Sequence, residues 1–248
     1  MLKKLNSDFQ TTLPKAVLFD TDNTLYDYEP ANLAAHKAVF QKAQNLIGID
    51  EPTFRIYFDK AKYQIKDQLN GTASSHSRLL YYQRLLELLG YRARLLIALD
   101  LEQTFWRTFL ANAPLFPFVM QTLSSLRSKN IPIAIVTDLT SHIQLRKLTY
   151  FGLEDTFDAV VTSEEVGADK PDIRNFQLVL SKLGIQSSEN IWMIGDDPYT
   201  DIYGAKKFGA ITFQKLHRDI KIGIGAQSPD FTFSSFKDII SLLNTLSS

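Results

Sequence analysis

The 248-residue sequence contains no cysteine. This absence excludes disulfide bonds, thiolate metal sites and a cysteine nucleophile, and it is compatible with a reducing cytoplasm. No apolar run approaches the ~20 residues that span a bilayer, and residues 1–8 lack the apolar stretch of a secretory signal. We therefore expect a soluble cytoplasmic protein with no membrane partner.

The sequence also lacks an excess of charge of either sign. Lysine plus arginine and aspartate plus glutamate both total 27, so the formal net charge is zero. There is thus no global basic field to attract nucleic acid or an anionic membrane, and any anion must be recognised locally. The sequence leaves the oligomeric state open, with a monomer as one alternative.

The hydrophobic pattern changes twice along the chain. A strand-like apolar run at 15–19 is followed by apolar positions at helical spacing, with breaks at Gly, Pro and Ser. From residue 114 onward, short strands alternate with helices. A lone strand cannot pair by itself, so 15–19 joins the later sheet. The predicted fold class is α/β, a Rossmann-like parallel-sheet core at 1–25 and 113–248 with an inserted all-helical domain at 26–112.

The elements expected from these patterns are short and regularly spaced. The inserted helices are expected at 30–46, 52–69, 77–89 and 92–110. After 15–19, the core strands are expected at 132–136, 159–162, 191–194, 211–213 and 231–233. The core helices are expected at 118–128, 141–150, 172–183, 200–208 and 236–246.

Two carboxylates follow the first strand, at the end where open α/β sheets bind ligands. Asp20 and Asp22 lie two positions apart, and alternate residues of an extended segment share a face. At ~4 Å and an effective dielectric constant of ~20, their repulsion is worth roughly 4 kcal/mol. A divalent cation between them would remove this penalty.

Polar residues also follow two later strands. Thr137 and Asp138 replace the apolar run after 132–136, and a hydroxyl with adjacent backbone N–H groups suits a phosphate oxygen. Pro171 keeps Lys170 extended and is expected to start the next helix. A fixed ammonium can neutralise a carboxylate and a phosphoryl group together. Taken alone, Thr137 is better explained as a helix N-cap or a loop hydroxyl, and Lys170 as a solvated charge.

A second acidic group follows the strand at 191–194. Gly195 permits close backbone approach. A helix N-cap before Pro198 explains Asp197, and the helix dipole favours Asp201. Neither effect explains Asp196, because an acid before the cap gains little from the helix and repels its neighbour.

These carboxylates suggest a metal site. Mg²⁺ prefers hard oxygen ligands and retains several waters. Asp20, the backbone carbonyl of Asp22 and Asp196 form a predicted half-shell, with water and substrate in the remaining positions.

In this order, the motifs resemble the haloacid dehalogenase superfamily of hydrolases, in the subgroup with a helical, C1-type cap between the first and second motifs. The matching blocks are Asp20-Thr21-Asp22-Asn23-Thr24, Thr137, Lys170-Pro171, and Gly195-Asp196 followed by Asp201. The resemblance covers nearly the full chain and implies that 26–112 is the cap.

The resemblance implies a Mg²⁺-dependent phosphatase that works through an aspartyl-phosphate. Asp20 is the implied nucleophile, and Asp22 is the general acid and then the base. The other implied roles are phosphate binding by Thr137, Asp138 and Lys170, and metal binding by Asp20, Asp22, Asp196 and Asp201, with Asp201 holding the ligands in place rather than contacting the ion. For Asp197, a place at the metal site and a role only as helix cap stay open.

The expected substrate is a small phosphorylated metabolite. The acid at Asp22 favours phosphate esters over haloacids, because a halide leaves without protonation. A phosphomutase and a non-catalytic phosphate-binding protein stay open as alternatives. In the insertion, Arg78 is the candidate for a second anionic group of the substrate, against the simpler explanation of a solvated residue in a first helical turn.

Overall fold

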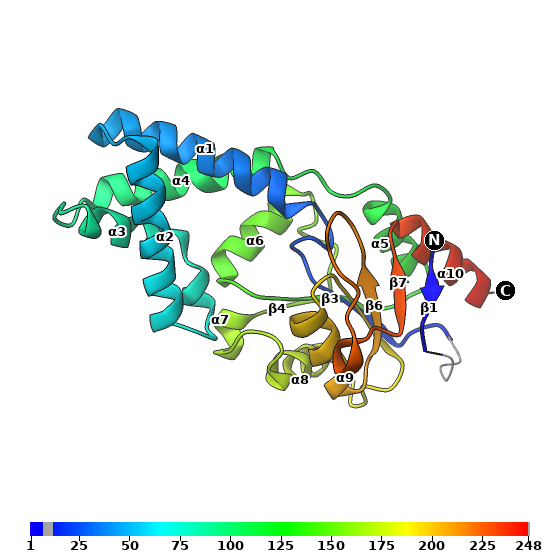
Figure 1. Ribbon diagram of the computed structural model, residues 1–248. Coiled ribbons are helices and arrows are strands. Elements are labelled where there is room, and N and C mark those ends of the chain that lie inside the picture. Colours follow the sequence, from blue (N-terminus) through cyan, green and yellow to red (C-terminus); the bar gives the residue numbers. More distant parts are fainter. Residues whose placement is uncertain (7–11, 248) are drawn as a thin grey trace. The chain divides into compact units, whose positions relative to one another are not determined.

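A computed structural model of the chain describes residues 1–6 and 12–247. It divides into two compact units (Figure 1). The first, here called the core unit, consists of Met1–Asp27 and Leu115–Ser248. The second, the helical unit, is Tyr28–Pro114. None of the helices in the described ranges is both long enough and apolar enough to cross a membrane.

The core unit is built on one twisted sheet. Its strands are β1 (Lys3–Lys4), β2 (Ala16–Phe19), β3 (Ile133–Thr137), β4 (Ala159–Thr162), β5 (Ile191–Gly195), β6 (Ile211–Lys215) and β7 (Phe231–Phe233). The order is β1-β7-β6-β5-β2-β3-β4, and every pair is parallel except β1 with β7. The predicted α/β class with a parallel sheet is therefore confirmed. Strand β1 was not predicted, because two exposed lysines carry no apolar pattern.

Strand β2 lies at the centre, which explains its unbroken apolar sequence. Val17 pairs with Ile133 of β3 on one side and with Trp192 of β5 on the other. All residues of β2 are fully buried, as expected of a parallel strand that is covered on both faces. The register fixes which strand ends lie next to one another, and therefore which side chains can meet.

Helices cover the sheet. They are α5 (Val119–Ser128), α6 (Ser141–Tyr150), α7 (Ser163–Val166), α8 (Ile173–Lys182), α9 (Gly204–Phe208) and α10 (Phe236–Leu246). Ala16 and Leu18 of β2 share a core cluster with Phe176 of α8 and Ala205 of α9. Alternate residues of a strand point to opposite faces, so this cluster is one of two apolar layers. Helix α5 packs on β3 and against α10.

Two local expectations in the core were wrong. The helix expected at 200–208 is preceded by a π-helical turn, η2 (Pro198–Tyr203), so α9 begins only at Gly204. Pro171 does not start a helix either, since α8 begins at Ile173 after its N-cap Asp172, which accepts a hydrogen bond from the backbone of Arg174. A capping carboxylate satisfies a free N–H group, which proline does not do.

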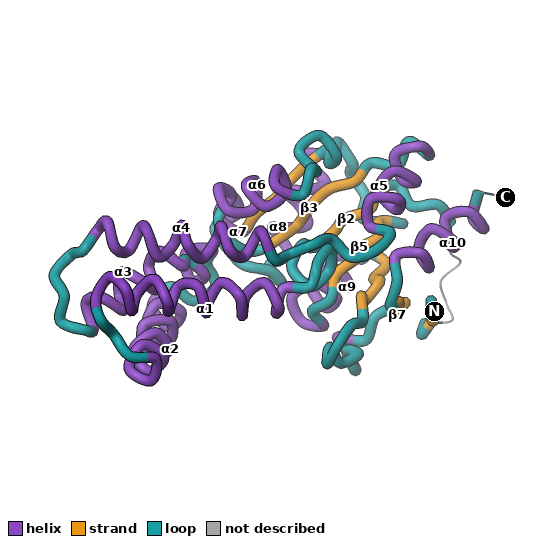
Figure 2. The backbone as a smooth tube through the Cα atoms, turned by 90° about the horizontal axis from the view of Figure 1, so that it is seen from above, coloured by secondary structure: helices purple, strands orange, loops and turns teal. Residues whose placement is uncertain are grey.

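The helical unit contains the four helices expected in this segment. They are α1 (Tyr28–Ile47), α2 (Glu51–Gln68), α3 (Arg78–Leu88) and α4 (Leu95–Ala111), with a 3₁₀ turn, η1 (Ala73–His76), before α3. Helix α1 runs beside α4, and α2 packs against α3 (Figure 2). The side chains of Asp50 and Ser77 cap α2 and α3, which accounts for where these helices begin.

Candidate active site

The polar strand ends of the core unit meet at one edge of the sheet. Strands β5, β2 and β3 are neighbours and parallel, so their carboxyl ends point the same way. Asp20 follows β2, Thr137 ends β3, and Asp196 follows β5. The backbone N–H of Asp20 donates to Ile194 O at 2.9 Å, which continues the ladder into the site. We call this edge the active-site edge.

Three carboxylates gather there. Asp20, Asp196 and Asp201 each offer an oxygen atom, and these atoms lie within 4.8 Å of one another. Burial, with the charge of Asp201 adding to it, raises the pKa of Asp196 to about 9. Burial likewise raises the pKa of Asp20 to about 7, against the opposing effect of Lys170. Acids held in this way are a favourable place for a cation, because a cation would restore their ionised form.

Lys170 is the cation that the protein itself supplies. Its ammonium is 2.6 Å from Asp20 Oδ1, 2.6 Å from Asp201 Oδ1 and 3.0 Å from Val136 O. Burial opposes its charge, but Asp20 and Asp201 raise the pKa of Lys170 well above its usual value. All three donors of the ammonium are thus used. The contact orients one oxygen of Asp20 and ties it to Asp201.

Asp138 supports this lysine from the backbone side. One of its carboxylate oxygens accepts the Lys170 backbone N–H at 2.8 Å. Burial raises the pKa of Asp138 to about 6. The residue predicted to bind substrate therefore also fixes the segment that carries Lys170.

Asp201 holds the loop after β5 in place. Its Oδ2 accepts the backbone N–H groups of Asp196 and Asp197, both at 3.1 Å. A Cβ atom at Gly195 would lie 2.4 Å from the same oxygen, so glycine is required for this approach. Asp197 accepts from Tyr199 N and Thr200 N, which confirms its interpretation as an N-cap. The helix dipole alone does not account for Asp201.

The carboxylate of Asp22 lies outside the group of three acids and has partners of its own. Lys147 Nζ is 2.7 Å from its Oδ1 and 3.1 Å from its Oδ2, and the Tyr26 hydroxyl donates to Oδ1. Burial alone would raise the pKa of Asp22, but the charge of Lys147 and the hydrogen bonds from Lys147, Tyr26 and Thr21 together outweigh it, and the pKa is lowered. Asp22 thus differs electrostatically from Asp20, although the two are only two residues apart.

Thr137 belongs to a buried hydroxyl and amide network. Its Oγ1 is 2.9 Å from Thr21 Oγ1 and accepts a hydrogen bond from Gln144 Nε2 at 2.9 Å. The N-cap interpretation of Thr137 was wrong, because Thr140 is the residue that precedes α6. Thr21 thus links the acidic loop to β3.

Tyr26, Gln144 and Lys147 were not predicted from the sequence. Gln144 and Lys147 lie three residues apart in α6 and are both 1% exposed. Residues at this spacing share a helix face, and here the face also carries Ile143 and Leu148. Long polar side chains at buried positions of an amphipathic helix were the signal that could have revealed them.

Arg78 lies in the helical unit, at the start of α3. Its guanidinium donates to Tyr28 Oη at 2.5 Å and to His76 O at 2.8 Å. It also lies over the ring of Phe105, 5.0 Å from the ring centroid. The interpretation as a freely solvated residue was therefore wrong.

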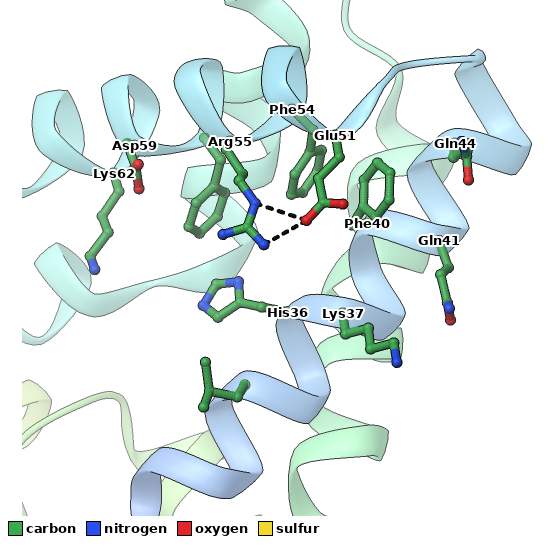
Figure 3. Close-up of a pocket in the computed structure, with 12 residues that line it drawn as sticks. His36, Lys37, Phe40, Gln41, Gln44, Glu51, Phe54, Arg55, Asp59 and Lys62 are labelled. Atoms are coloured by element: carbon green, nitrogen blue, oxygen red, sulfur yellow. Dashed lines mark hydrogen bonds and ion pairs between the residues drawn. The ribbon is translucent and has the colours of Figure 1, made fainter.

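The helical unit also contains a cavity of about 560 Å³ between α1 and α2. Figure 3 shows His36 of α1 pointing toward Arg55 of α2, which pairs with Glu51. Burial, with Arg78 adding to it, lowers the pKa of His36 to about 4. The residues that line this cavity include none of the site residues predicted from the sequence.

Comparison with known proteins places this arrangement among hydrolases. Residues 14–209 match the family model for haloacid dehalogenase-like hydrolases. The chain is 42% identical over 198 residues to a ribulose-1,5-bisphosphate 5-phosphatase of Halopiger xanaduensis, covering 79% of this chain and 82% of that protein. It is 26% identical over 234 residues to a glyceraldehyde 3-phosphate phosphatase of Methanocaldococcus jannaschii, covering 94% of this chain and 98% of that protein.

Solved structures share the fold. A 2-haloacid dehalogenase from Pseudomonas syringae superposes with a TM-score of 0.73 at 22% identity, covering 94% of this chain and 99% of that chain. The hydrolase YfnB from Bacillus subtilis gives a TM-score of 0.69 at 24% identity, covering 93% of this chain and 99% of that chain.

Proposed function

Because the chain belongs to the haloacid dehalogenase-like hydrolase family and is one of its phosphatases, we propose that Asp20 is the nucleophile of its active-site edge. The observation that carries this proposal is the contact of Lys170 with Asp20 beside Asp196 and Asp201. It leaves Asp20 with an oriented carboxylate beside one lysine and two further acids that can bind a metal ion.

In the first step an oxygen of Asp20 attacks phosphorus, and the bond to the ester oxygen breaks. Asp22 gives a proton to that leaving oxygen. In the second step Asp22 takes a proton from water, whose oxygen attacks phosphorus and releases inorganic phosphate from Asp20. Lys170 offsets negative charge throughout, and Thr137 donates to a phosphoryl oxygen.

The donor set also fits Mg²⁺. Hard carboxylate oxygens are its preferred ligands, and burial among other acids, which raises the pKa values of Asp20 and Asp196, favours a further cation beside them. Asp20, Asp196 and the backbone carbonyl of Asp22 would hold the ion, with Asp201 fixing their loop. When bound, Mg²⁺ would neutralise charge on the transferring phosphoryl group.

The helical unit is proposed as a cap that excludes water and selects the leaving group. The names of the relatives favour a small phosphorylated sugar as substrate, and a cytoplasmic location is part of the same proposal. Arg78 is the residue of this unit proposed to contact substrate, because its guanidinium has hydroxyl, carbonyl and aromatic partners but no carboxylate among the described residues.

The test is hydrolysis of p-nitrophenyl phosphate by purified protein with Mg²⁺. Asp20→Asn should abolish phosphate release, whereas Asp155→Asn, at an exposed position of the core unit, should retain it. Undiminished turnover by Asp20→Asn would refute the proposal. With sugar phosphates, free phosphate identifies the hydrolase and an isomeric sugar phosphate the mutase.

A further inference from the structure

A buried lysine lies at the active-site edge but takes no part in the reaction described above. Lys215 is the last residue of β6, which pairs with β5. The register places Gly195 opposite Gln214, so the next positions on the two chains are Asp196 and Lys215. Lys215 thus lies at the same end of the sheet as Asp196, on the side away from β2.

The ammonium of Lys215 has few partners for its burial. The residue is 2% exposed. Its Nζ donates to Leu216 O at 3.3 Å and lies 4.3 Å from the centroid of the Phe116 ring. Within the described part of the chain, no carboxylate lies at ion-pair distance from it. Burying an ammonium that has three donors and no counter-ion is costly, which points to an anion that the protein does not itself provide.

Two further groups that can carry positive charge follow Lys215 in the sequence, Arg218 and His217. Arg218 Nε is 2.6 Å from Asp27 Oδ2, and His217 Nε2 is 3.6 Å from Asp27 Oδ1. His217 Nδ1 is buried and has no hydrogen-bond partner. Asp27 is thus at ion-pair distance from Arg218 but not from Lys215. This leaves local positive charge and an unused imidazole nitrogen.

We infer that Lys215, His217 and Arg218 form a subsite for a second phosphate group of the substrate. The inference rests on the proposed function, because the first phosphate is the one attacked by Asp20. Strand β6 is two strands from β2, and neighbouring strands are about 4.8 Å apart, so the two phosphates would be separated by roughly 10 Å. The substrate class is a bisphosphate with a short carbon chain between its phosphates.

The matched probes are pentane-1,5-diol bisphosphate and pentane-1,5-diol monophosphate, which differ only in the second phosphate. The native protein should show a kcat/KM at least about tenfold higher for the bisphosphate, the effect of one charge-assisted contact. Lys215→Met should bring this ratio close to one, mainly through KM. Lys221→Met, at an exposed position of the following loop, should keep the native ratio.

Equal kcat/KM values for the two esters in the native protein, or a native ratio in folded Lys215→Met, would overturn the inference. If Lys215→Met fails to fold, Arg218→Gln, on an exposed side chain, decides in its place by the same ratio. If no ester is hydrolysed, the proposed function fails. Titration calorimetry of both esters against native and variant protein then tests the subsite. The ratio of the affinities for the two esters takes the place of the ratio of their kcat/KM values.

Discussion

Asp20 and Asp22 show how two similar residues acquire different properties. Asp20 is buried beside other acids and one lysine, and its pKa is raised to about 7. The side chain of Asp22 is 35% exposed, and Lys147 and Tyr26 hold its pKa below the usual value. An acid that must give and then take a proton depends on such neighbours.

Lys147→Met should move the pH profile of kcat/KM for p-nitrophenyl phosphate to higher pH. Without the ammonium, burial dominates, the pKa of Asp22 rises, and its protonated form persists to higher pH. Arg146→Met, at an exposed position of the same helix, is the control and should keep the native profile. An unshifted profile in folded Lys147→Met would show that Lys147 does not set the pKa of Asp22.

At this scale the sequence indicates Asp20 and Asp196 because each comes at the end of an apolar strand, and it indicates Lys170 through the proline that follows it. It does not indicate Lys147, whose partner is 125 residues away. That pairing depends on how α6 is oriented toward the loop after β2, which local periodicity does not define. The catalytic and metal-binding roles of the predicted residues stay predictions.

Among the elements, the junction of β5 and η2 is constrained by the close approach of Asp201 to Gly195. The Asp201 carboxylate accepts a hydrogen bond from the backbone N–H of Asp196, in the loop before η2. Gly195 leaves the space that this carboxylate occupies. The sequence predicted the strand and the glycine's close approach, but not the π-helical turn. Its hydrogen bonds are set by Asp201 and Asp197 together, which propensity does not capture.

Gly195→Ala should lower the free energy of unfolding by about 1–3 kcal/mol, as overpacking does, and should also impair turnover by displacing Asp201. Gly48→Ala is the control, since a Cβ atom there would meet nothing within 4 Å and only the φ of +68° is unfavourable. That substitution should cost roughly 1 kcal/mol and leave turnover intact. Chemical denaturation with activity assays measures both; full activity in Gly195→Ala would contradict the account.

For the whole molecule, the hydrophobic pattern of the sequence was informative about the fold. Its change from helical spacing to short strands alternating with helices indicates a helical segment inserted in an α/β core. The α/β class follows from the apolar strands, whereas β1 depends on an edge pairing with β7 that polar residues do not announce. Charge balance was less informative, since zero net charge says nothing of the concentration of acids at one edge.

The acids gathered at the active-site edge should make the stability of the metal-free protein fall as pH rises from about 6.5 to 8. Asp20 and Asp196, with pKa values raised to about 7 and 9, bind more protons in the folded than in the unfolded state across this range. Below it, His36, whose pKa is lowered to about 4, opposes the trend. Above it, Lys215, with its pKa lowered to about 8, opposes it as well.

Mg²⁺ should reverse this slope, because metal binding displaces the protons and strengthens as pH rises. Thermal unfolding with EDTA and with Mg²⁺ between pH 6.5 and 8 measures the difference. Asp196→Asn, which removes the carboxylate with the higher pKa, should reduce the slope in EDTA. Identical slopes with and without Mg²⁺ would contradict a metal site among these acids.

The central claim is that Asp20 carries the phosphoryl group during turnover. The most direct measurement is acid quenching of the enzyme during hydrolysis of p-nitrophenyl phosphate, followed by mass spectrometry of its peptides. The account predicts a phosphoryl group on Asp20 that hydroxylamine removes and that is absent from Asp20→Asn. A phosphoryl group on another residue, or native turnover by Asp20→Asn, would contradict it.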